Sequence, residues 1–164
     1  ACIYLPRKGQ ECDAAKAANT FDVNLTGVAN GLDPVLKAML ARGKGHVAVT
    51  ASVAGFGGLP QAAAYSATKA GLIAMAQSLA LDLMDLGVRI SVVNPGFVET
   101  EATGVNAFKM PFVMTPEEAA RRIVDGLERP GFEITFPRRF AFFLRALGLL
   151  PNQLYFRAWR RMTR

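Results

Sequence analysis

The chain has 164 residues, of which 51% are hydrophobic and 20% charged, with a formal net charge of +6. A chain of this size buries roughly 70% of its unfolded surface, so it can form a core without disulfides or a structural metal. Cys2 and Cys12 show no zinc-ligand spacing with the single histidine, His46. We therefore expect free thiols, one of which could be buried, no bound metal and a reducing, intracellular location.

The positive charge is confined to the end of the chain. Residues 1–136 hold 12 Lys and Arg against 13 Asp and Glu, whereas residues 137–164 hold seven Arg and no acid. The body lacks the basic surface that nucleic-acid binding needs, so we expect no nucleic-acid partner. We divide the chain into a folded domain, residues 1–136, and a basic amphipathic helical tail, residues 137–164.

The first predicted element is a helix between Asp13 and Arg42, because apolar residues recur there at steps of three and four. Pro34 lies inside it and predicts a kink or break, since proline removes a backbone donor. The short run from His46 to Thr50 follows a glycine-rich turn. It predicts a strand that is buried on both faces, with no catalytic duty for His46.

A second long helix is predicted from Tyr65 to Leu86. Apolar side chains occupy nearly every face of it, so we expect it to be covered on two sides. A strand is predicted at Val88–Val93 and ends at the turn signal Asn94-Pro95-Gly96. Residues 45–68 carry no charged side chain, but glycine, proline and polar residues interrupt them, so we expect no membrane span there.

The next helix is predicted to begin at Thr115. Thr115 suits the N-cap, Pro116 the first helical position, and Glu118 the reciprocal partner of a capping box. A last strand is predicted from Phe132 to Phe136. The alternation of helix and strand predicts a parallel α/β sheet with right-handed crossovers.

The tail carries one apolar stripe, which Pro151 interrupts, and then an aromatic segment among arginines. The stripe consists of Phe140, Phe143, Leu144, Leu147 and Leu150. Such a pair of basic helices is typical of a membrane interface. Packing over the folded domain explains the same pattern equally well, so both interpretations stay open.

Tyr65 and Lys69 stand four residues apart at the start of a predicted helix, so they share one face. A nearby ammonium stabilises phenolate and moves the pKa of tyrosine toward the range in which it can transfer protons at neutral pH. The alternative for this pair is an ordinary amphipathic helix start. The spacing alone is weak evidence, because both residue types are common.

Three further polar positions are predicted to lie near this pair. Ser52 follows a strand, at the sheet edge where doubly wound folds bind ligands, and Asn94 follows the next strand. The Ser52 hydroxyl could donate to the substrate oxygen that Tyr65 protonates, and no G-x-S-x-G pattern of a serine hydrolase surrounds it. Asn24 lies inside a helix, which its side chain disfavours, although a surface position would explain it too.

Four segments agree in order and spacing with one family: F-D-V-N-L at 21–25, V-T-A-S-V-A-G at 49–55, Y-S-A-T-K at 65–69 and N-P-G-F-V-E-T at 94–100. From about residue 1 to residue 136 the chain resembles the short-chain dehydrogenase/reductase family. The resemblance implies a Rossmann-like, doubly wound parallel sheet that is incomplete here, with about the last four strands and their helices. It also implies a homo-oligomer formed through the two long helices, in which Ala67, Ala70, Gly71 and Ala74 would allow close approach.

The resemblance also implies a role for each site residue. Tyr65 would be the general acid/base, Lys69 would lower its pKa and hold the nicotinamide ribose, and Ser52 would orient the substrate. Asn24 would interrupt its helix and place a water for proton relay. The nicotinamide side of NAD or NADP, which supplies the hydride, would be lined by Pro95, Gly96, Val98 and Thr100. Thr100 could instead simply begin a turn.

The family's glycine-rich phosphate turn, T-G-x-x-x-G-x-G, does not occur in this sequence. The family's N-N-A-G segment would end near Ala1, with Cys2 in place of glycine. We therefore expect a C-terminal piece that begins near the fourth strand of a seven-stranded sheet. The choice between NAD and NADP stays open, because the residue that discriminates them would lie in the missing half.

The function that follows is an oxidoreductase that interconverts a secondary alcohol and a ketone. Apolar side chains in the expected lid favour a lipophilic substrate, unless they merely pack on the core: Phe97, Phe108, Met110, Phe112, Val113 and Met114. The alternative is a truncated, non-catalytic homologue that acts as an oligomerisation or interaction partner. Residues 1–8 lack the order of a secretion signal, so we expect a cytoplasmic protein, with membrane association through the tail as the open variant.

Overall fold

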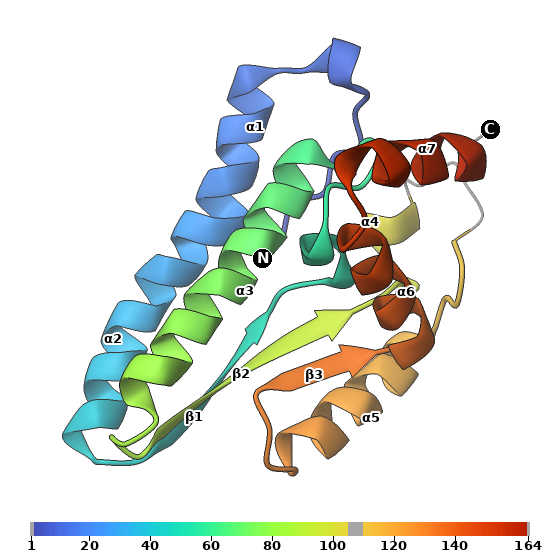
Figure 1. Cartoon of the computed structure of the whole chain (residues 1–164). Helices are drawn as coiled ribbons and strands as arrows, with labels where there is room; N and C mark the ends of the chain where they lie inside the picture. Colours follow the sequence, from blue (N-terminus) through green and yellow to red (C-terminus); the bar gives the residue numbers. More distant parts are fainter. Residues whose placement is uncertain (1, 105–109, 164) are drawn as a thin grey trace.

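The computed structural model describes residues 2–104 and 110–163, and within them three strands form one parallel sheet (Figure 1). The strands β1 (Gly45–Thr50), β2 (Val88–Pro95) and β3 (Glu133–Phe136) lie in the order β1-β2-β3. The expected parallel α/β fold is confirmed, but the described sheet has three strands rather than about four. Residues 2–4 are not a strand, and the backbone of Ile3 is hydrogen-bonded to the Asn24 side chain instead.

Helices cover both faces of this sheet (Figure 1). The helices α1 (Ala14–Phe21) and α2 (Gly27–Ala41) continue one another beside α3 (Ala63–Leu83), and α5 (Pro116–Leu127) lies on the other face. The main core lies between the sheet and α3, where Leu72, Ala76 and Val92 are fully buried. Four short or terminal helices lie toward the carboxyl ends of the strands: η3 (Val53–Phe56), α4 (Glu101–Gly104), α6 (Arg138–Gly148) and α7 (Asn152–Met162). A further short turn, η1 (Gly9–Glu11), precedes α1.

The first long helix is irregular at Asn24 rather than at Pro34. A π-helical segment, η2 (Asp22–Thr26), joins α1 to α2, and α2 continues through Pro34 without ending. The predicted break at Pro34 is therefore wrong. The carbonyl that loses its N–H partner to this proline belongs to Asn30, which is exposed, as Pro34 is.

The prediction that β1 is buried on both faces is also wrong. Val49 of β1 is buried against α3, but Ala48 and Thr50 are exposed, because β1 is an edge strand of the described sheet and no described helix covers that face. The helix α3 is covered on two sides, by α1 and by the sheet, as predicted, and its remaining side leaves Leu81 69% exposed. Gly71, which we expected on an oligomer face, lies against Leu25 of the same chain.

The start of α5 follows the prediction in part. Thr115 is the N-cap, its Oγ accepting the N–H of Glu118 at 3.2 Å, and Pro116 is the first helical residue. The Glu118 carboxylate does not complete the capping box, because it accepts from Arg122 at 2.7 Å. A charged donor one turn away is a stronger partner than a neutral backbone N–H.

The two tail helices pack on the rest of the chain. The stripe of α6 is buried at Phe140, Leu144 and Leu147, while Phe143 is 44% exposed. Tyr155 of α7 donates to Gly58 O at 2.6 Å. Among the helices of the described residues, none combines the length and the apolar character that crossing a bilayer requires.

Candidate active site

Ser52 lies where β1 gives way to η3. The N–H of Ala51 donates to Val93 O at 2.8 Å, which extends the pairing of β1 with β2 and brings Ser52 beside Pro95. Ser52 is the N-cap of η3, with its Oγ accepting the N–H of Ala54 at 3.1 Å. The same hydroxyl donates to Pro95 O over 3.4 Å. That long bond leaves its proton weakly held.

Tyr65 lies in the first turn of α3, and its hydroxyl is hydrogen-bonded to Ser52. Burial raises the pKa of Tyr65 to about 12, the neighbouring Cys2 thiol adds to the rise, and the hydrogen bond from Ser52 opposes it. This differs from the lowering by Lys69 that the resemblance implied. The Lys69 Nζ lies 5.6 Å from the Tyr65 ring centre and donates to Thr50 O at 3.1 Å, so it is directed past the phenol oxygen. At neutral pH the phenol keeps its proton, which is the form that a proton donor needs.

Lys69 is 5% exposed, and burial lowers the pKa of its ammonium, while the nearby Cys2 thiol opposes this effect. Gly55, which lies in the turn after Ser52, packs directly against the backbone of Lys69. A Cβ on Gly55 would lie 2.8 Å from the Lys69 carbonyl carbon and oxygen. Only glycine lets η3 approach α3 this closely, which is what brings Ser52 to the start of that helix.

Asn24 lies in η2 and is 2% exposed. Its Oδ1 accepts from Ile3 N at 2.7 Å, and its Nδ2 donates to Ile3 O at 2.7 Å and to Thr68 Oγ1 at 3.5 Å. The expected local interruption of the helix is present, and the buried amide ties the first residues of the chain to α3. Its part in a proton relay remains a prediction.

The residues expected to line the cofactor divide into two groups. Pro95 and Gly96 adjoin the site: Pro95 O accepts from Ser52, and Gly96 N donates to Phe136 O at 2.7 Å. Val98 and Thr100 lie further along the chain. Val98 forms a bridge with Met114, and the carbonyl of exposed Thr100 accepts from the N–H groups of Thr103 and Gly104 in α4, which is the turn-forming role left open above.

A small cavity of about 100 Å³ adjoins these groups and is lined by Ser52, Tyr65 and Gly96. Its remaining walls are largely apolar and come from Tyr4, Val53, Leu59, Phe97 and Phe140, among others. The ring of Tyr4 packs edge-on against that of Tyr65 at 4.9 Å. Sequence reasoning missed Cys2 and Tyr4, although Cys2 stands in place of the last residue of the N-N-A-G-like segment and Tyr4 lies two residues after it. Nothing in the sequence indicated Phe140.

The expected apolar lid does not act as one unit. Phe97 lines the cavity and packs on Phe140 with ring centres 5.7 Å apart, whereas Met114 is buried in the core beside β3. Phe112 and Val113 are exposed, Met110 is partly buried, and Phe108 lies outside the described residues. Lid and core packing therefore each explain part of the segment.

Cysteine and histidine side chains do not gather into a metal site in the part of the chain that the structure describes, where no group of three His, Cys, Asp or Glu could hold an ion. Cys2 and Cys12 are both free and exposed, so the expectation that one could be buried is wrong. Cys2 nevertheless lines the cavity and contacts Tyr65 and Lys69, because the first residues lie across the start of α3.

Comparison with known proteins agrees with this geometry. The family model described as short chain dehydrogenase matches residues 1–109. An uncharacterised oxidoreductase of Myxococcus xanthus is 43% identical over 142 residues, which are 87% of this chain and 56% of that protein. An acetoacetyl-CoA reductase of Synechocystis is 43% identical over 83 residues, 51% of this chain and 35% of that protein.

A solved structure shares the fold over nearly the whole chain. A short chain dehydrogenase of Burkholderia cenocepacia, in complex with NADP, superposes with a TM-score of 0.81 at 23% identity. The match covers 96% of this chain and 65% of that one, so the chain spans between about half and two thirds of the length of the Myxococcus xanthus and Burkholderia cenocepacia proteins. The sequence match, together with the convergence of Ser52, Tyr65 and Lys69, shows that the chain belongs to the short-chain dehydrogenase family.

Proposed function

We propose that the protein is an NAD(P)-dependent oxidoreductase that interconverts a secondary alcohol and a ketone, with Tyr65 as the general acid and base. One observation supports this above all. The Tyr65 and Ser52 hydroxyls are hydrogen-bonded at the mouth of an apolar cavity, and a buried ammonium, Lys69, lies one helical turn away. Proton transfer to a substrate oxygen needs a donor, a second polar group that orients the oxygen, and exclusion of water.

In the direction of ketone reduction, the Tyr65 phenol donates its proton to the carbonyl oxygen. The Ser52 hydroxyl, weakly held by Pro95 O, turns to donate a hydrogen bond to the same oxygen and fixes its position. A bound nicotinamide cofactor supplies the hydride that the carbonyl carbon gains. The Lys69 ammonium, one helical turn away, stabilises the phenolate that this transfer leaves until it takes up a proton again, since a neighbouring cation favours the charged form.

The residues on this side of the site fit the nicotinamide end of such a cofactor. Lys69 carries three N–H donors, of which Thr50 O accepts one, and sugar hydroxyls are suitable acceptors for others. Gly96 presents backbone without a side chain at the cavity wall. Pro95, Val98 and Thr100 would continue this lining. We propose that the cofactor is NAD or NADP. The NADP in the Burkholderia cenocepacia structure supports NADP and does not exclude NAD.

The substrate that we propose is lipophilic. Val53, Leu59, Phe97 and Phe140 give the cavity beside Ser52 and Tyr65 an apolar wall, which favours an alkyl chain next to the reacting carbonyl. The Synechocystis relative is named as an acetoacetyl-CoA reductase, and this supports a ketone carried on an acyl chain.

The test is cofactor oxidation by the purified full-length gene product. NADH or NADPH consumption is followed with alkyl ketones and 3-ketoacyl thioesters of increasing chain length. We expect ketone-dependent oxidation with one of the two cofactors, and a kcat/KM that rises with chain length. The non-catalytic alternative predicts that calorimetry detects no binding of either cofactor at millimolar concentration, and that result would overturn the proposal.

We also propose that the protein forms homo-oligomers through its long helices. Ala67, Ala70 and Ala74 are exposed along α3, and small residues on one helix face allow a second helix to approach closely. Sedimentation velocity at several concentrations should show a dimer or tetramer. Ala70→Glu should dissociate it, and a wild-type monomer at every concentration would contradict the idea.

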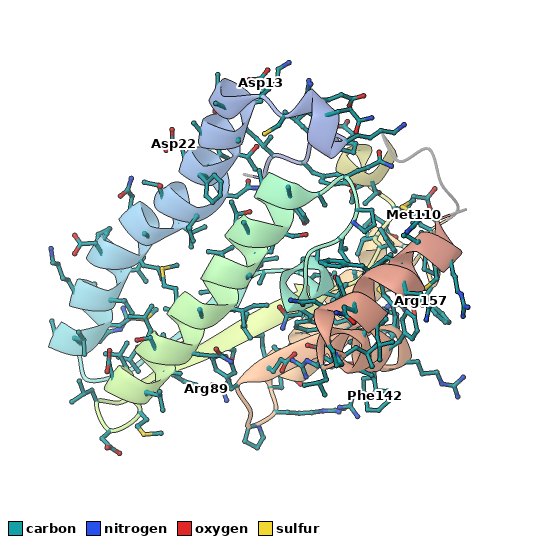
Figure 2. All side chains as sticks on the ribbon, turned by 45° about the horizontal axis from the view of Figure 1, so that its top comes forward. Asp13, Asp22, Arg89, Met110, Phe142 and Arg157 are labelled. Atoms are coloured by element: carbon teal, nitrogen blue, oxygen red, sulfur yellow. The ribbon has the colours of Figure 1, made fainter. Side chains whose placement is uncertain are left out.

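For the tail we propose peripheral contact with an anionic membrane through the outer face of α7. Leu154, Phe156 and Met162 are about half exposed beside Arg157, Arg160 and Arg161, and Figure 2 shows Arg157 on the outside of this helix. Each such arginine contributes about 1 kcal/mol near an anionic surface. The full-length product should co-sediment with phosphatidylserine vesicles at low salt, and deletion of residues 138–164 should abolish this. Equal co-sedimentation after the deletion would leave α7 as a packing element only.

A further inference from the structure

Arg145 of the tail helix α6 touches two segments that form the candidate active site. Its Nη2 donates to both carboxylate oxygens of Glu133, at 2.5 and 2.6 Å. The Cζ of its guanidinium lies over the ring of Phe56, 4.2 Å from the ring centre. Glu133 belongs to β3 and Phe56 to η3, so one side chain bridges a strand and the loop that follows another strand.

Through Glu133, Arg145 is connected to the turn expected to line the nicotinamide. The Oε1 of Glu133 accepts from Asn94 Nδ2 at 3.0 Å and from the Thr135 hydroxyl. Asn94 is fully buried and leads directly into Pro95 and Gly96. A buried amide that loses its charged acceptor carries an unsatisfied donor, which is costly, so the position of Asn94 depends on where Glu133 is held.

Through Phe56, the same arginine is connected to Ser52. Phe56 is the last residue of η3, the single turn that Ser52 caps. The helix α6 lies directly on this turn, since a Cβ on Gly148 would approach Phe56 O to 3.1 Å. A cation above the face of an aromatic ring is attracted to that ring. A guanidinium can lie over the ring and still donate hydrogen bonds from its edge to a carboxylate.

We propose that Arg145 is a positioning residue, which holds the Ser52 turn and the Asn94-Pro95-Gly96 turn in fixed relation to each other. The inference rests on the proposed function, because those two turns carry the substrate-orienting hydroxyl and the cofactor-lining backbone. Misplacement of such groups by about 1 Å can cost on the order of a hundredfold in rate. Lysine cannot replace this arginine, since it has neither the planar stack nor the forked donors.

The charge state of Glu133 fits this role. Burial raises the pKa of its carboxyl, but hydrogen bonds from Arg145, Thr135 and Asn94 outweigh that effect and lower the pKa below its usual value. The carboxylate therefore stays ionised at neutral pH and accepts from all three donors.

An ordinary surface ion pair elsewhere in the chain provides a matched control for Arg145. Arg122 donates to Glu118 at 2.7 Å, and its side chain is 45% exposed, against 49% for Arg145. The Arg122 pair lies within α5 and spans one turn of a single helix. If Arg145 contributed only an ion pair, Arg145→Met and Arg122→Met would have the same consequences.

The experiment is hydrogen exchange on the full-length gene product, followed by kinetics. We expect Arg145→Met and Arg145→Lys to speed amide exchange several-fold in peptides covering residues 50–56 and 92–97, and Arg122→Met to leave both unchanged. Ketone turnover should fall at least about tenfold in both Arg145 variants, with NADPH Kd altered less than kcat. Glu133→Gln, which keeps an acceptor for Asn94 but loses the charge, should give an intermediate effect and serves if Arg145→Met does not fold.

Equal exchange in the Arg145→Met and Arg122→Met proteins would overturn the inference. Rescue of both exchange and turnover by Arg145→Lys would do so too, because charge alone would then suffice. If the wild-type protein reduces no ketone, the proposed function fails. The exchange data still decide whether Arg145 holds the two turns together.

Discussion

The two ends of the sheet both carry buried polar side chains, but they use them differently. At the amino end, His46 of β1 contacts Ser91 of β2 through Nε2 at 2.9 Å, and Arg89 contacts the His46 Nδ1 at 2.9 Å. Ser91 also donates to Gly131 O at 3.2 Å. Figure 2 shows Arg89 at the end of the molecule opposite to Met110 and Arg157.

The hydrogen bonds at the amino end form a closed series. Arg89 can only donate, so His46 accepts at Nδ1 and donates from Nε2 to Ser91, whose proton goes to Gly131 O. At the carboxyl end, Ser52 holds Pro95 O only at 3.4 Å, and Tyr65 lines a cavity. The difference teaches that polar burial alone does not mark a site. A site is indicated by hydrogen-bond donors that are only weakly bonded within the protein and that line a cavity.

The largest contrast should come from the two serines. Ser52→Ala should lower ketone turnover of the full-length product by about a hundredfold, the usual cost of one donor aimed at a developing oxyanion. Ser91→Ala should leave turnover unchanged and cost roughly 0.5–1.5 kcal/mol of unfolding free energy, because only a structural bond is lost. Steady-state kinetics and urea unfolding of both variants measure this. Similar losses of turnover in both variants would remove the distinction between the two ends.

A smaller effect is expected where the Ser52 turn meets α3. Gly55→Ala should destabilise the protein by roughly 1–3 kcal/mol, since its Cβ would press on the Lys69 carbonyl and force a backbone shift. Gly58→Ala, two residues after the end of that turn at Phe56, is the control, because no atom lies within 4 Å of its Cβ. Urea midpoints of the two variants provide the comparison, and equal midpoints would show that the close approach is not needed.

The smallest effect is a pH dependence at the amino end. Burial, and then the charge of Arg89, lowers the pKa of His46 below 6.5. Its neutral form therefore stabilises the fold above pH 6.5, and that contribution is lost as pH falls through 6.5 toward the lower folded-state value. Urea unfolding between pH 7.5 and 5.5 should show declining stability, and His46→Gln should flatten the decline. An unchanged slope in His46→Gln would exclude His46 as the cause.

Much of the fold follows from residue patterns. The strands at Val88 and near His46, the helix that starts at Thr115 and Pro116, and the parallel arrangement all agree with local periodicity and capping. The exposure of Ala48 and Leu81 could not be predicted in this way, because burial depends on which elements cover a face and not on the sequence of the face itself.

The candidate site was predictable at Ser52, Tyr65, Lys69 and Asn24, since a fixed spacing on the helix and the ends of parallel strands place them together. The contacts of Phe140 and Arg145 were not. Both belong to the tail, and their approach to η3 depends on tertiary packing between segments about 90 residues apart in the sequence. The direction of the Tyr65 pKa shift also required the structure, because burial raises this pKa, whereas the spacing alone suggested that Lys69 lowers it.

The central claim is that Tyr65 supplies the proton, and Tyr65→Phe in the full-length gene product tests it most directly. Turnover of ketone with NADPH or NADH should fall by about 10²–10⁴-fold, the range of a lost general acid, while the cofactor Kd measured by calorimetry stays within about twofold. Turnover close to that of the wild type would contradict the claim.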